Sequence, residues 1–193
     1  MDVHTAAPDW SKVPAPDDDG AARHLPGSRV PPVVLPATDG TALDLSALPG
    51  RVVVYAYPRT SAPGGAGGVD GWDMIPGARG CTPQSCAFRD HFAELKGLGV
   101  SRLFGLSTQD TAFQREAAER LRLPFPLLSD EGFELARAMR LPTFEAGGAV
   151  LLKRLTLVLR DGAVERVFYP VFPPDRNAAD VVAWLSGEGR PAA

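Results

Sequence analysis

Two cysteines, Cys81 and Cys86, have the residue type and the spacing that thiol redox chemistry requires. They are the only cysteines of the 193-residue chain, and four residues separate them. A thiolate acts as a nucleophile and can be oxidised to a sulfenic acid, which condenses with a second thiol to form a disulfide. In a reducing compartment, a single close pair of cysteines is more often catalytic or redox-active than structural. The pair therefore indicates a thiol-based redox site.

The residues after Cys81 predict that this cysteine lies where a helix begins. Thr82 suits the N-cap position, and Pro83 suits the first helical position because its missing N–H would have no partner there. The N-terminus of a helix presents free N–H groups and a partial positive charge, and both favour a thiolate over a thiol. We therefore expect Cys81, just before the N-cap, to be the nucleophile.

The four-residue separation also predicts how the two thiols interact. In a continuous helix, residues i and i+5 have Cα atoms about 8–9 Å apart, whereas a disulfide needs them within roughly 7 Å. We therefore expect two free thiols in the reduced fold, and a disulfide only after the first helical turns unwind. One alternative to a redox site is that Cys81 is an unreactive loop thiol and Cys86 a small core residue of the helix. Another is a zinc site, but zinc needs four ligands and only His91 lies near the pair, so no metal or other cofactor is predicted.

The elements that would position this pair alternate between strand and helix patterns. The run from Arg51 to Tyr57 is almost continuously apolar, which is typical of a strand buried on both faces of a sheet. A glycine-rich loop at 58–80 follows, and loops of this length tend to be functional or disordered. A three-layer α/β/α fold with a mixed central sheet is predicted by the order of the remaining elements: a hairpin at 33–43, a helix over 82–98, a strand at 102–107, a helix at 111–121, a strand at 125–128, a helix ending near 139, a hairpin at 154–169 and a helix at 177–186. Residues 140–153 show no clear period.

The composition fits one globular domain. Apolar residues make up 45% of the chain and charged residues 22%, both close to globular averages. Residues 1–26 carry several prolines and no periodicity, so we expect a mobile N-terminal tail there and a single domain over 27–193. The net charge of −3 argues against a nucleic-acid surface, and no apolar run approaches the ~18 residues of a membrane helix. The first ten residues lack the basic and apolar regions of a signal peptide, so we expect a cytoplasmic protein.

The segment Gly80–Asp90 (G-C-T-P-Q-S-C-A-F-R-D) resembles the active-site helix of the peroxiredoxin Q, or bacterioferritin comigratory protein, group, whose members typically carry G-C-T-x-x-x-C-x-F-R-D. Four further segments resemble the family in the same order: the strand ending in Tyr-Pro at 51–58, the strand at 104–108, the segment at 123–130 and the hairpin start at 154–162. The resemblance covers residues 28 to 187, and five pieces in the right order make it specific.

This resemblance implies a thioredoxin-like fold and a thiol-dependent peroxidase that reduces hydrogen peroxide or organic hydroperoxides. It implies that Cys81 is the peroxidatic cysteine, Cys86 the resolving cysteine and Arg154 the arginine that reaches the peroxidatic thiolate from a strand. It also implies an intramolecular disulfide that thioredoxin or glutaredoxin reduces. The oligomeric state, monomer or homodimer, stays open.

The segment before the first cysteine departs from the family. Members usually carry the motif P-x-x-x-T-x-x-C ending at the peroxidatic cysteine, but the corresponding positions here are Met74 and Ala78. Pro58 and Thr60 look like the start of the motif, and the glycine-rich loop separates them from the cysteine. We therefore expect one of two arrangements: the loop bulges out and returns these residues to the site, or another hydroxyl, such as that of Thr82, takes over.

Three other interpretations stay open from the sequence. A shifted register would make Cys86 peroxidatic with Pro76 and Thr82, but Thr82 then lies four residues before the cysteine instead of three. The second is a thiol-disulfide oxidoreductase of the same fold, although such proteins usually have two residues between their cysteines. The third is a redox-sensing or binding domain whose altered motif no longer supports turnover.

Overall fold

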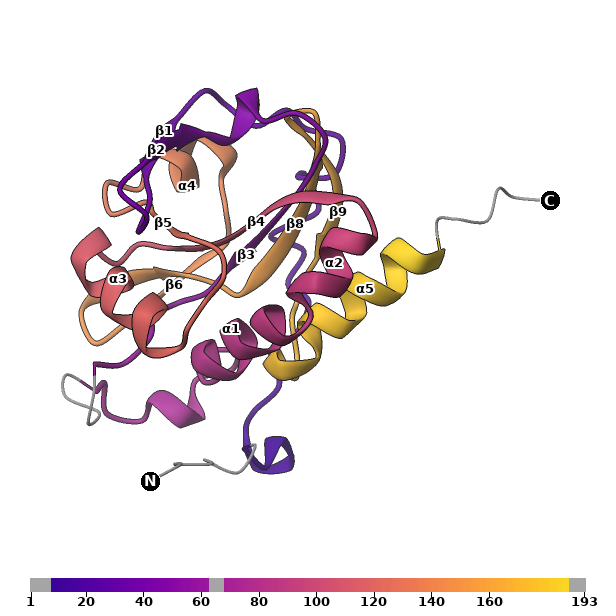
Figure 1. Cartoon of the computed structure of the whole chain (residues 1–193). Coiled ribbons are helices and arrows are strands. Elements are labelled where there is room, and N and C mark those ends of the chain that lie inside the picture. The colour runs from indigo at the N-terminus through magenta and orange to yellow at the C-terminus, as the bar shows by residue number, and fades with distance from the viewer. Residues whose placement is uncertain (1–7, 63–67, 188–193) are drawn as a thin grey trace.

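The computed structural model describes residues 8–62 and 68–187, and a five-stranded mixed sheet lies at its centre (Figure 1). The strand order is β5-β4-β3-β8-β9. Strands β3 and β4 are parallel, as are β4 and β5, whereas β8 runs antiparallel to β3 and to β9. The mixed sheet predicted from the sequence is thus confirmed. Its strands are β3 (Arg51–Ala56), β4 (Val100–Ser107), β5 (Leu127–Ser129), β8 (Leu155–Arg160) and β9 (Ala163–Phe168).

The central strand β3 is buried on both faces, as its apolar run predicted. Val52 and Val54 belong to one hydrophobic cluster, and Val53 and Tyr55 belong to the other. Successive side chains of a strand point to opposite faces, so β3 contributes to both cores at once. A strand in this position needs a continuous apolar run instead of an alternating one.

Helices cover the two faces of the sheet to give three layers (Figure 1). On one face lie α1 (Cys81–Asp90), α2 (Phe92–Gly97) and α5 (Asn177–Gly187), which bury Phe88, Leu95 and Val181 in the core. On the other face lie α4 (Glu134–Met139) and the hairpin of β1 (Val34–Pro36) with β2 (Ala42–Asp44). Helix α3 (Thr111–Arg120) packs beside β5. No helix in the described ranges is long and apolar enough to cross a membrane.

The helix predicted over 82–98 is two helices, and it begins one residue earlier than expected. The helix is interrupted at His91, which ends α1 and precedes α2. Gly80 is the N-cap, so Cys81 is the first helical residue, and the prediction that Thr82 caps the helix is wrong. Gly80 has φ 110°, and a Cβ atom there would lie 2.5 Å from the Pro174 side chain and 2.8 Å from the Trp10 ring. Glycine is therefore required at this position for both conformation and space.

Residues 8–26 pack against the domain, which corrects the expected mobile tail for that part of the chain. The Trp10 indole N–H donates to the Asp175 carboxylate at 2.8 Å. Val13, Ala22 and Leu25 are buried. These buried residues are isolated from one another along the chain and lie outside regular helices and strands, so the sequence shows no hydrophobic periodicity here that would predict packing. Residues 1–7, the rest of the expected tail, lie outside the described residues.

Two segments that the sequence left unassigned pack against each other. Residues 140–153 contain a hairpin of β6 (Thr143–Ala146) and β7 (Ala149–Leu152), which turns at two glycines with positive φ. Trp72, in the described part of the glycine-rich loop, lies against Phe144 with ring centroids 6.3 Å apart. Residues 63–67 of that loop lie outside the described residues. A Gly-Gly pair between two strands favours a two-residue hairpin turn, so Gly147-Gly148 is the sequence feature that could have predicted the β6–β7 hairpin.

Candidate active site

The fold brings Cys81 to Arg154, a residue 73 positions away in the sequence. Cys81 lies in the first turn of α1 and is buried. Its Sγ atom contacts Nη2 of Arg154 at 3.4 Å and the Ala78 carbonyl oxygen at 3.8 Å. Arg154 directly precedes β8, the strand that pairs with β3, so the central sheet fixes its position beside the helix start.

Arg154 is almost fully buried, with 3% of its surface exposed, and its guanidinium is held from two sides. Nη2 also donates to the carbonyl oxygens of Gly77, Ala78 and Arg79 at 3.1–3.3 Å. Nη1 donates to Oε1 of Gln84 in α1. Among the described residues, the hydrogen-bond partners of this guanidinium are carbonyl oxygens, the Gln84 amide oxygen and the Cys81 sulfur. Its positive charge is therefore available to an anion that forms at Sγ or on an oxygen bound there.

Gln84 continues the buried contacts away from the cysteine. Its Nε2 donates to Oδ1 of Asn177 at 2.9 Å, and the Thr156 hydroxyl donates to the same oxygen at 2.6 Å. All three residues are buried. Sequence reasoning missed them, although Gln84 lies three residues after Cys81 and so shares its face of the helix.

Cys86 lies further along α1 and is half-buried, and both cysteines are free thiols. Burial raises the pKa of the Cys86 thiol, and the nearby Arg89 partly offsets this effect. Among the described residues, Arg154 contacts Cys81 and makes no hydrogen bond to Cys86. The shifted alignment, in which Cys86 would be the peroxidatic cysteine, therefore leaves that cysteine without an arginine partner.

Comparisons with known proteins agree with this geometry. The Redoxin family model matches residues 25–183. Peroxiredoxin Q of Sedum lineare, a chloroplastic protein, is 32% identical over 166 residues, which cover 85% of this chain and 79% of the relative. The chain belongs to the peroxiredoxin Q group of the redoxin family. The thioredoxin-like fold that the resemblance implied is therefore confirmed.

Other relatives show the same family. Chloroplastic peroxiredoxin Q of Oryza sativa subsp. japonica is 34% identical over 161 residues, which cover 82% of this chain but only 65% of that protein. This chain thus spans about two thirds of the length of that relative. Among solved structures, peroxidoxin BcpB from Mycobacterium tuberculosis is 29% identical, with a TM-score of 0.67 and coverage of 85% of this chain and 98% of that chain.

The departure from the family motif leaves Cys81 without the expected hydroxyl from Thr60. Thr60 is buried, but its N–H and hydroxyl both donate to Oε1 of Gln109, at 2.9 and 3.3 Å. Ala78 occupies the threonine position of the motif and contributes only its carbonyl oxygen. Of the two arrangements considered, the one in which the Thr60 hydroxyl donates to Cys81 is not found, because this hydroxyl donates to Gln109. Replacement of this hydroxyl by Thr82 stays a prediction.

Two tyrosines, Tyr55 in β3 and Tyr57 just after it, belong to the hydrophobic cluster that also contains Cys81 and Phe88 of α1. Tyr55 stacks on Phe88 with ring centroids 4.5 Å apart, and its hydroxyl donates to Ser85 at 3.0 Å. Burial raises the pKa of both Tyr55 and Tyr57 above the ordinary tyrosine value, and a charge on Cys81 raises it further. Both phenols therefore stay neutral, and this layer supports the helix that carries the cysteines.

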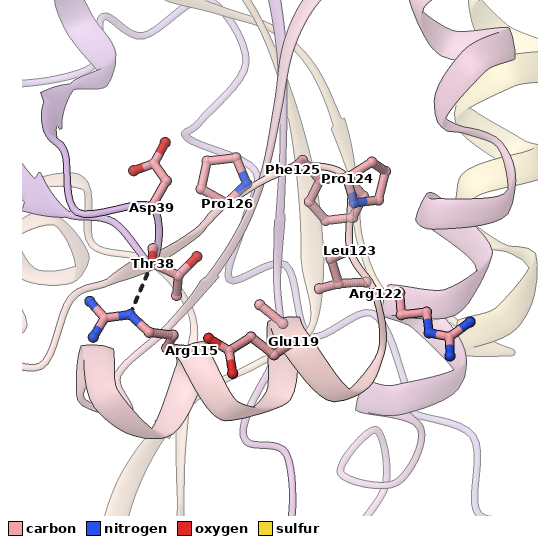
Figure 2. A pocket seen from close by; sticks show the side chains of 10 residues that line it. Thr38, Asp39, Arg115, Glu119, Arg122, Leu123, Pro124, Phe125 and Pro126 are labelled. Atoms are coloured by element: carbon pink, nitrogen blue, oxygen red, sulfur yellow. Dashed lines mark hydrogen bonds between the residues drawn. The ribbon is translucent and has the colours of Figure 1, made fainter.

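Two hollows differ in their relation to this site. A cavity of about 330 Å³ is lined by Arg154, Ile75, Phe144 and Tyr169, among others, and so includes the arginine of the site in its wall. A shallow pocket between α3 and the β1–β2 turn holds neither cysteine nor Arg154 (Figure 2). In that pocket Arg115 donates to the Thr38 carbonyl, which ties α3 to the turn. The pocket in Figure 2 is therefore not the redox site.

Proposed function

We propose that this chain is a thiol peroxidase in which Cys81 is the peroxidatic cysteine. The observation that carries the proposal is the buried Arg154 guanidinium, which contacts Sγ of Cys81 at 3.4 Å at the start of α1. A buried cation beside a sulfur at a helix N-terminus stabilises negative charge that develops on that sulfur or on an oxygen bound to it. Membership of the peroxiredoxin Q group supports the same activity.

The first step is attack by the Cys81 thiolate on one oxygen of a hydrogen peroxide or organic hydroperoxide. The S–O bond forms as the O–O bond breaks, and the departing oxygen takes up a proton to leave as water or an alcohol. Negative charge on that oxygen is stabilised by the Arg154 N–H groups and by the free backbone N–H groups of the first turn. Arginine suits this role because it stays protonated and offers donors in a fixed geometry. Cys81 becomes a sulfenic acid.

The second step joins Cys81 to Cys86. Because both residues lie in α1, their Cα atoms are about 8–9 Å apart, too far for a disulfide. The start of α1 must therefore unwind, which also separates Gln84 from Arg154. The Cys86 thiol then gives up its proton and attacks the Cys81 sulfur, and the sulfenic acid hydroxyl takes up a proton and leaves as water. A dithiol protein such as thioredoxin or glutaredoxin reduces the resulting disulfide by exchange.

The test compares two single substitutions under identical conditions. Cys81→Ser should abolish peroxide consumption, whereas Cys86→Ser should complete one round of sulfenic acid formation and lose cycling with thioredoxin. Mass spectrometry of the oxidised wild-type protein should locate the bond between residues 81 and 86. Full peroxide consumption by Cys81→Ser would disprove the proposal.

A second candidate is a redox sensor without efficient turnover. The observation that favours it is Ala78, which leaves the motif position without a hydroxyl. In that case, Cys81 should oxidise slowly, and no dithiol reductant should sustain peroxide consumption. Steady turnover with thioredoxin would exclude this candidate.

A further inference from the structure

Gln84, in α1, accepts a hydrogen bond from Nη1 of Arg154, and the orientation of its amide is set by a residue outside α1. We propose that Asn177 and Thr156 are positioning residues for the peroxide reaction. They orient the Gln84 amide, which in turn holds Arg154 against Cys81. This inference rests on the proposed peroxidase function.

The direction of each hydrogen bond follows from the chemistry of the arginine. A guanidinium has only donors, so Gln84 must present its oxygen to Nη1. Its amide N–H then faces Asn177, which must present Oδ1 in turn. The Thr156 hydroxyl completes the sequence by donating to the same Oδ1. Only one orientation of the two amides satisfies every contact.

Burial makes this orientation exclusive. Gln84 and Thr156 have no exposed surface, and Asn177 has 1%. Without Asn177, the Gln84 N–H would be left unpaired in the interior, and rotation of the amide would place that N–H against the guanidinium. Either result weakens the contact to Nη1, because a buried donor without an acceptor is unfavourable.

The two positioning residues belong to parts of the fold that the redox cycle does not need to move. Thr156 is in β8, two residues after Arg154, so both side chains emerge on the same face of the sheet. Asn177 is the first residue of α5, whose Val181 and Leu185 are buried in the core. The network therefore ties the start of α1, which unwinds in the proposed cycle, to β8 and α5, and it orients the arginine only while α1 is helical.

The test uses two reactions of one thiol, measured in a Cys86→Ser background so that only Cys81 reacts. Oxidation by hydrogen peroxide needs the arginine to stabilise the departing oxygen, whereas alkylation by iodoacetamide does not. Asn177→Leu should lower the peroxide rate constant about tenfold relative to the alkylation rate constant. Thr156→Val should lower this ratio about twofold to threefold, because Asn177 keeps its oxygen and loses one donor.

Two further variants separate positioning from stability. Asn177→Asp restores an acceptor for Gln84 and should recover most of the ratio. Val181→Ala weakens the packing of the same helix without touching the network, and should leave the ratio unchanged. An unchanged ratio in Asn177→Leu, or equal losses of both rates, would overturn the inference. If the Cys86→Ser protein itself does not react with peroxide, the proposed function fails instead.

Discussion

The two sides of Cys81 are built by different means. On the C-terminal side, α1 is a regular helix whose sequence follows the family motif, and Gln84 and Phe88 anchor it to the core. On the N-terminal side, residues 68–80 form turns and one short 3-10 helix, and the carbonyl oxygens of residues 77–79 accept from Nη2 of Arg154. The helix side thus uses side chains and the loop side uses backbone to hold the same guanidinium. A motif can therefore change on one side of a reactive residue while its charged partner stays in place.

Removal of Arg154 should have the largest effect, because both sides depend on it. Arg154→Met should slow oxidation of Cys81 by hydrogen peroxide by about 10²–10³-fold, since the departing oxygen loses its main donors. Arg154→Lys keeps the charge but loses the fixed donor geometry, so its rate constant for oxidation should lie between those of the wild type and Arg154→Met. Stopped-flow oxidation of the reduced proteins measures both rates. The rate of disulfide reduction by thioredoxin should change much less, and equal losses in both steps would argue against the role of Arg154 in the first step.

Substitution of Gly80 tests the junction between the two sides. Gly80→Ala should lower the free energy of unfolding by about 2–4 kcal/mol, because a Cβ there combines positive φ with overlap of the Trp10 and Pro174 side chains. Gly99 also has positive φ but has open space around its Cβ position, so Gly99→Ala should cost only about 1 kcal/mol. Urea denaturation of the reduced proteins gives both values, and similar costs would mean that the Trp10 contact does not matter.

Restoration of a hydroxyl tests the loop side alone. Ala78→Ser adds one hydroxyl at the motif position, whose backbone carbonyl oxygen lies 3.8 Å from Sγ, and should raise the peroxide rate constant by about tenfold, equivalent to one hydrogen bond of about 1.4 kcal/mol. Stopped-flow oxidation compares it with the wild type. No increase would indicate that another group, such as Thr82, already supplies this contact.

The pH dependence of stability tests the helix side alone, and should be the smallest effect. Burial raises the pKa of Cys86 above its ordinary value of 9.0, so the folded protein favours the protonated thiol. The resulting stability is fully present below pH 9 and is lost as the pH rises through the folded-state pKa. Urea denaturation at pH 7 and 10 should show a larger loss for the reduced wild type than for Cys86→Ser. Equal losses would show that Cys86 has no preference for the thiol in the folded state.

Local patterns in the sequence were enough to predict the elements around the cysteines. The apolar run of β3, the hairpin at 154–169 and the cysteine pair at a helix start each depend on neighbouring residues, so they can be predicted from the sequence. The sequence predicted Thr82 instead of Gly80 as the N-cap of α1, because residue preferences for cap positions take no account of the distant Trp10 and Pro174 side chains that require glycine there.

The sequence by itself determined the order of most strands and helices along the chain, the cysteine pair and its helical setting, because hydrophobic period and turn residues act over short distances. Only the tertiary structure decided which polar groups meet: Arg154 with Cys81, Gln84 with Asn177, and Thr60 with Gln109. The physical reason is that a buried polar side chain needs a partner, and the partner comes from whichever distant element the packed sheet places within hydrogen-bond distance.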